Sequence, residues 1–324
     1  MSGFPLRTAV AAMLFAVCAP FAVATDDAGL LPVKDFARDA QLMSPRLSPD
    51  GQHLAVRVDY EEQGQHALMV YNIADMSKPL SMLRLPKFEL PAEIDWASPT
   101  RLVVAIGKQY GSLGKPGYTG EILGTDLDGK NQAYLYGYKY VGGRREATRS
   151  LDQGWGTIDS FPEHANGHFY MSTESYDEND NHSHLYDVDA VHNTRHLIGD
   201  IDVGGLEFMV GADGTALYAY GSDQENRTVV YHRVGGDWVQ MDPAQVGKTF
   251  VPITYTPDHQ HIYALYSADG GPDLVCQVTA VSIDGAVATA TVTASYLLAA
   301  CCSGYTFPST TLSLRFPADA ATSD

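Results

Sequence analysis

The sequence has few basic residues for its length. Its 324 residues include 21 Lys and Arg against 39 Asp and Glu, which gives a formal net charge of -18. Proteins that bind nucleic acids depend on clustered Lys and Arg to contact phosphates, and no basic run of any length is present. The charge therefore argues against a nucleic-acid partner and favours an acidic, solvated surface.

Cysteines are also scarce. The chain has 4, of which Cys18 lies near the N-terminus and Cys276, Cys301 and Cys302 lie near the other end. Without Cys18, which lies in the predicted N-terminal signal peptide, three cysteines remain, and an odd number with one adjacent pair does not make a disulfide framework, which needs spaced and paired thiols. The fold is therefore expected to depend on its hydrophobic core, for which the 45% hydrophobic content is sufficient.

The sequence lacks a hydrophobic run long enough to cross a membrane. The longest N-terminal run, Ala9–Val17, follows Arg7 and is followed by the small-residue motif Ala22-Val23-Ala24. This arrangement is typical of a secretory signal peptide and too short for a membrane span. We predict a signal peptide over residues 1–24 and a periplasmic or secreted protein.

A strand–turn–strand pattern recurs along the chain. Its first copy is Ser44–Val56, in which Pro49, Asp50 and Gly51 favour a tight turn between two apolar runs. Related segments follow at residues 94–104, 164–171, 210–218 and 255–263. Their spacing of roughly 45 to 50 residues, with one gap of about 65, is the period of four-stranded propeller blades.

The repeat predicts an all-β fold, a β-propeller with about five recognisable four-stranded blades over residues 25–285. From residue 286 onward the chain is rich in Ala, Thr and Ser and has no further Pro-Asp-Gly turn. We interpret residues 286–324 as an atypical C-terminal tail or a degenerate last blade, so that the ring is incomplete or open.

The exported N-terminus, the hairpin Leu47-Ser48-Pro49-Asp50-Gly51 and the strand pattern of Leu68–Asn72 resemble the N-terminal propeller of the prolyl oligopeptidase family of serine peptidases. The resemblance is to the bacterial branch that is like dipeptidyl peptidases and acylaminoacyl peptidases, and it covers roughly Asp35 to Gly285. It implies a propeller that filters peptides before they reach a C-terminal α/β-hydrolase domain.

The sequence departs from that family in one respect. A hydrolase domain needs a Gly-x-Ser-x-Gly nucleophile elbow, and no such pentapeptide is present. The nearest segment, Tyr110–Gly114, has Tyr110 at the first glycine position, and Ser303 lacks the surrounding pattern. No catalytic residue is assigned, and the propeller portion is expected to be inactive without its catalytic domain, as in a truncated gene. The alternative is a stand-alone periplasmic binding or interaction module.

Histidines recur at short spacings. His182 and His184, like His259 and His261, stand two apart, which places both imidazoles on one face of a strand. The pairs 164/168 and 192/196 are four apart and would need a helix. No third ligand has a predictable position, so neither a metal site nor a cofactor is assigned.

Two other patterns have simple structural explanations. Residues 177–182 begin like a calcium loop, but His182 occupies the glycine position and Val188 the position of the bidentate Glu. The tyrosine-rich strands, which could line a peptide or carbohydrate surface, are better explained by packing between blades.

An open propeller predicts self-association. Ring closure pairs the last blade with the first, and without it unpaired strand edges are left to associate with other chains. We expect oligomers or marginal solubility at micromolar concentration. Sizing chromatography tests this, and a sharp monomer peak would contradict it.

Overall fold

The computed structural model describes residues 42–60, 64–110, 114–138, 152–177, 179–223, 225–255, 261–271, 274–279, 289–294 and 310–315. The predicted signal peptide, residues 1–24, lies outside them. Within the described part, no helix is long and apolar enough to span a membrane.

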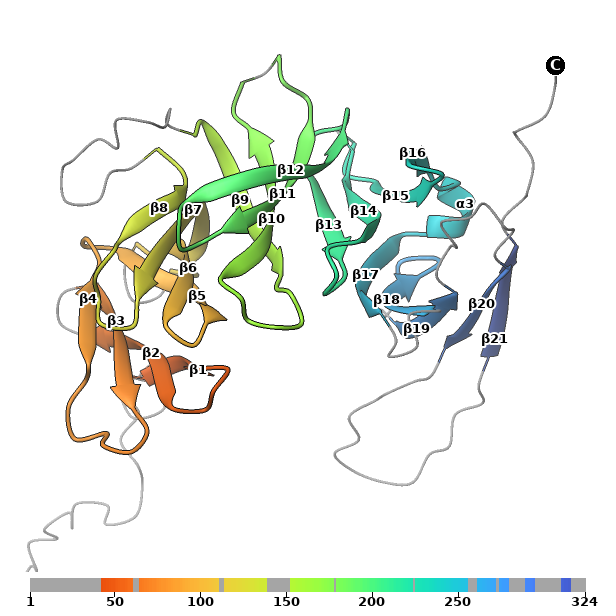
Figure 1. The fold of residues 1–324 in the computed structure, drawn as a ribbon. Coiled ribbons are helices and arrows are strands. Elements are labelled where there is room, and N and C mark those ends of the chain that lie inside the picture. Colours follow the sequence, from red (N-terminus) through yellow and green to blue (C-terminus); the bar gives the residue numbers. More distant parts are fainter. Residues whose placement is uncertain are drawn as a thin grey trace, which may run out of the picture. The chain divides into compact units, whose positions relative to one another are not determined.

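The described strands form antiparallel sheets in which neighbouring strands follow one another in sequence (Figure 1). The first sheet comprises β1 (Leu42–Leu47), β2 (His53–Tyr60), β3 (Gln65–Asn72) and β4 (Ser81–Arg84). The second comprises β5 (Glu89–Ser98), β6 (Arg101–Lys108), β7 (Gly117–Asp126) and β8 (Ala133–Tyr136). The third comprises β9 (Gly154–Ser160), β10 (His168–Ser175), β11 (Ser183–Asp189) and β12 (Thr194–Ile201).

The fourth sheet comprises β13 (Leu206–Val210), β14 (Ala216–Ser222), β15 (Thr228–Val234) and β16 (Asp237–Gln240). A short helix, α3 (Pro243–Val246), leads to the fifth sheet. That sheet comprises β17 (Thr249–Tyr255), β18 (His261–Ser267), β19 (Leu274–Thr279), β20 (Thr289–Ala294) and β21 (Thr310–Arg315). Strands β20 and β21 come from the region interpreted above as a tail or degenerate blade.

The all-β fold with four-stranded sheets in the order of propeller blades is confirmed. The first predicted turn forms as expected: Gly51 has φ 71°, and its N–H donates to the Ser48 carbonyl at 2.8 Å. The Asp50 carboxylate accepts from the Gln52 N–H at 3.1 Å. Strand β7 begins at Gly117, inside the glycine-rich stretch 107–120.

The core lies between consecutive sheets. Four buried clusters of hydrophobic side chains each combine residues from two sheets that follow one another in sequence. Leu68 of the first sheet, for example, belongs to the same cluster as Ile94 and Leu102 of the second. This packing of sheet against sheet is the arrangement of propeller blades.

The sequence of strand β6 is apolar at almost every position because both faces of the strand are buried. Leu102, Val104 and Ile106 belong to the cluster shared with the first sheet. Val103 and Ala105, which point the other way, belong to the cluster shared with the third sheet. Because side chains alternate between the faces of a strand, a strand that is buried on both faces reads as a continuous hydrophobic run.

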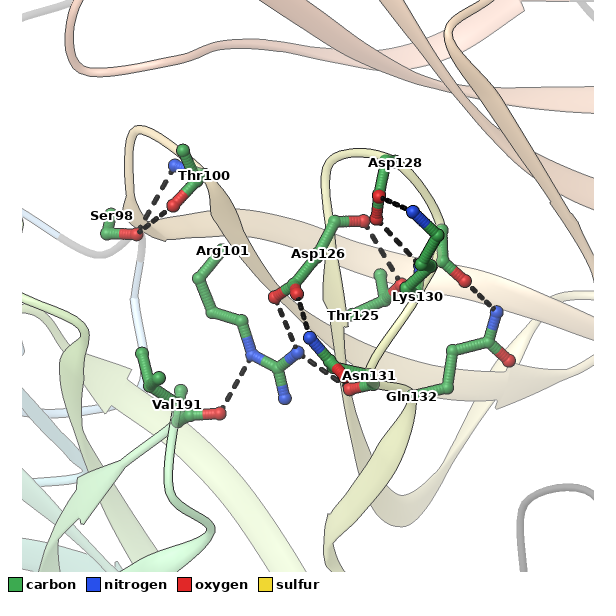
Figure 2. A network of polar contacts seen from close by, with 12 residues as sticks. Ser98, Thr100, Arg101, Thr125, Asp126, Asp128, Lys130, Asn131, Gln132 and Val191 are labelled. Carbon is green, nitrogen blue, oxygen red and sulfur yellow. Dashed lines mark hydrogen bonds and ion pairs between the residues drawn. The ribbon is translucent and has the colours of Figure 1, made fainter.

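A buried arginine joins the second and third sheets (Figure 2). Arg101, which is 2% exposed, donates from Nε to the Ala190 carbonyl at 2.8 Å. Its Nη1 donates to the Asp126 carboxylate at 2.9 Å and to the Asn131 carbonyl at 2.7 Å. The guanidinium therefore satisfies acceptors in the β7–β8 turn and in the β11–β12 turn together.

The substitution Arg101→Met is expected to lower the free energy of unfolding by about 3 kcal/mol, because it leaves buried acceptors and a carboxylate without their partner. Urea denaturation followed by circular dichroism measures the change. Lys130→Met is the matched control, since Lys130 forms an exposed pair with Asp128 at 2.7 Å and such pairs contribute little. Equal effects of the two substitutions would contradict the structural role of Arg101.

Candidate functional site

Two polar cavities, of about 150 and 200 Å³, lie where the third and fourth sheets meet. They have Thr157 and Glu207 in common. The smaller is also lined by Trp155, Ser172, Thr173, Glu174, Gly205 and Leu206. The larger is also lined by residues 158–160, 208–210 and 252–254 and by Tyr220. We call the two together the acidic cavity, because Asp159, Glu174 and Glu207 all lie on its walls.

Asp159, on β9, is enclosed at the cavity wall. Its Oδ1 accepts from the Ser172 hydroxyl at 3.0 Å, and its Oδ2 is shielded from solvent without accepting a hydrogen bond. Burial raises the pKa of Asp159 well above its usual range, the Ser172 hydroxyl opposes this, and the nearby charge of Glu207 adds to it. The Asp159 carboxyl is therefore harder to ionise than an exposed aspartate.

Glu207, on β13, is exposed and accepts a hydrogen bond from the Tyr220 hydroxyl at 3.0 Å. Burial and the Glu207 charge raise the pKa of Tyr220, which keeps the phenol protonated as a donor. The acidic cavity thus presents the Glu207 carboxylate as its accessible hydrogen-bond acceptor. An accessible carboxylate in a polar cavity suits a ligand with N–H donors or with a positive charge.

A second pair of acids lies on β5. Burial raises the pKa of Glu93 to about 6, and the negative charge of Asp95 is the second cause of this increase. Asp95 pairs with Arg46, whose Nε lies 3.2 Å from its Oδ1. Three consecutive sheets therefore carry acids on their first strands, β5, β9 and β13.

The predicted histidine pair at 182 and 184 comes together with a third ligand. The two rings stack with centroids 5.7 Å apart, as expected for one face of a strand. Asp200 of β12 pairs in register with His184, and its Oδ1 lies 2.9 Å from His182 Nδ1 and 3.7 Å from His184 Nε2. One ligand atom from each of the three residues lies within 4.8 Å of the others.

The other histidines of the sequence analysis are placed differently. His168 lies 2.7 Å from the Asp187 carboxylate and 4.0 Å from that of Asp189, and His192 lies 2.6 Å from the Asp189 carboxylate. His259 and Ser303 lie outside the described residues, as does the side chain of His261. Tyr136 and Tyr218 are buried in the clusters between sheets, which agrees with a packing role.

No family model matches the sequence, and no curated protein matches it. Among solved structures, the chain is similar to a prolyl endopeptidase (14% identity, 85% of this chain and 39% of that chain, TM-score 0.40). It is similar to the Pyrococcus horikoshii acylaminoacyl peptidase (11% identity, 79% and 42%, TM-score 0.43). It is also similar to a eukaryotic initiation factor (11% identity, 74% and 52%, TM-score 0.43).

These similarities include peptidases of the family named in the sequence analysis and a protein outside it. The chain covers about half or less of the length of each of these proteins. At identities of 11 to 14%, the likeness assigns no activity or residue role to this chain.

The enclosed acid at Asp159 predicts a pH-dependent effect of Asp159→Asn. A folded-state pKa above the unfolded value means that the native state binds more protons, so the Asp159 carboxyl destabilises the fold increasingly as pH rises above about 4. Asn cannot ionise, so the variant is expected to melt about 2 to 4 °C higher than the wild type at pH 8. The two proteins should melt at similar temperatures at pH 4. Thermal unfolding across this pH range checks the result. The prediction is refuted if the melting temperature of the variant minus that of the wild type is lower at pH 8 than at pH 4.

Proposed function

We propose that this chain is the propeller portion of an exported serine peptidase similar to prolyl oligopeptidases, and that its acidic cavity holds peptides for a hydrolase domain. The observation that carries the proposal is that the carboxylates of Glu207 on β13 and Asp159 on β9 line the same polar cavity. A peptide offers N–H donors and a cationic amino terminus, and the Glu207 carboxylate is complementary to both.

The chain is proposed to be inactive alone. Acyl transfer by this kind of enzyme needs a serine on a strand-to-helix turn together with an acid and a histidine, and the 324 residues contain no Gly-x-Ser-x-Gly. The purified chain should therefore not hydrolyse chromogenic peptides, whereas it should bind them.

Peptide binding provides the quantitative test. A fluorescent heptapeptide with a free amino terminus and one Lys is expected to bind the full chain, and Glu207→Gln is expected to weaken its affinity about tenfold by removing a charged hydrogen-bond acceptor. Fluorescence anisotropy measures both. Glu225→Gln is the control, because Glu225 is exposed, pairs with Arg227 at 2.9 Å and lines neither part of the acidic cavity. No binding by the wild type, or the same loss in both variants, would overturn the proposal.

The same cavity also supports the second candidate function, a stand-alone periplasmic binding module. The two differ in what is encoded after codon 324: a Gly-x-Ser-x-Gly motif followed by Asp and His favours the peptidase, and an unrelated gene favours the binding module. Export is proposed for both. If the signal peptide is removed after Ala24, N-terminal sequencing of the protein purified from cells should give Thr25 as the first residue.

A further inference from the structure

We propose that His182, His184 and Asp200 form a zinc site at the outer edge of the third sheet. The site is separate from the acidic cavity, since none of its three residues lines that cavity. His182 precedes β11, His184 lies on β11, and Asp200 lies opposite it on the edge strand β12. Among the described residues this is the group in which three ligating side chains converge.

The spacing of the ligand atoms suits a small metal ion. Zinc–ligand bonds of about 2.0 to 2.2 Å at tetrahedral angles place the ligand atoms roughly 3.3 to 3.5 Å apart. Asp200 Oδ1 lies 2.9 Å from His182 Nδ1 and 3.7 Å from His184 Nε2. Because all three ligand atoms lie within 4.8 Å of one another, a change of at most about 1.5 Å in each separation would bring them to tetrahedral spacing.

The backbone that carries the two histidines is firmly held. Ser183, between them, is fully buried. Its hydroxyl donates to the Val203 carbonyl at 2.7 Å and accepts from the Leu206 N–H at 2.9 Å. On the other side, the His184 ring stacks on Tyr186 with centroids 6.0 Å apart. Ligands that are oriented before the metal arrives bind it with less loss of entropy.

The chemistry of the ligands selects the metal class. Two imidazoles and one carboxylate suit Zn²⁺, whereas Ca²⁺ and Mg²⁺ prefer oxygen ligands alone. Asp202 Oδ1 lies 3.5 Å from His182 Nε2 and adds negative charge at the site. Three protein ligands leave a fourth position of the tetrahedron for water, which is available because Asp200 is exposed.

Isothermal titration of the full-length, tag-free protein with ZnCl₂ tests the proposal. We expect one Zn²⁺ per chain and a loss of affinity of at least about tenfold in each of His184→Gln and Asp200→Asn, since even outer-shell changes cost that much. His192→Gln is the matched control: it removes an exposed imidazole that also pairs with a carboxylate, Asp189, but does not belong to the group of three ligands that converge. This control should bind as the wild type does.

Replacing Zn²⁺ by Co²⁺ gives a second measurement that does not depend on stability. Tetrahedral Co²⁺ absorbs visible light strongly, and we expect this band in the wild type and the control but not in Asp200→Asn. Circular dichroism of each variant verifies that it is folded. The proposal is overturned if the wild type binds no zinc, if His184→Gln and Asp200→Asn bind it unchanged, or if His192→Gln loses binding to the same extent.

Discussion

The structure depends on the burial of both faces of each central strand. In the second, third and fourth sheets, one face packs against the preceding sheet in the sequence and the other against the following one. Strand β6 supplies alternate residues to two clusters at once. Removing one sheet would therefore expose hydrophobic surface on its neighbours, which makes the stability of each sheet a property of the sheets next to it.

The turn residues account for what the sequence predicted well. Pro49, Asp50 and Gly51 specify a tight turn by their own backbone preferences, so the hairpin of β1 and β2 could be located without tertiary information. The related turn before β10 is followed by an antiparallel pairing of β10 with β11, from His168 with Asp189 to Thr173 with His184. Strand β12 was not predicted, because most of its side chains are exposed or half-buried and show no apolar alternation.

The third ligand of the histidine pair could not be predicted for a geometric reason. Near the β11–β12 turn Asp189 pairs with Thr194, and an unbroken ladder would place Gly199 opposite His184. An irregularity between Leu185 and Tyr186 shifts the register by one residue and places Asp200 there instead. A one-residue shift exchanges the faces of a strand, and sequence patterns do not locate such bulges.

The acidic cavity was missed because Asp159 and Glu207 come from separate repeats that meet only after the sheets pack.

Since the faces of the central strands are occupied by packing, polar chemistry is left to the first strands and the outer edges of the sheets. The third sheet has both: Thr173 lines the acidic cavity and pairs across the sheet with His184, which pairs with Asp200. Two strand spacings place Thr173 and Asp200 about 10 Å apart. Unit charges at that separation in water interact by only about 0.4 kcal/mol, and physiological salt reduces this further. A metal at the edge and a peptide in the cavity would therefore bind almost independently, although the paired residues Thr173, His184 and Asp200 connect their sites across the sheet.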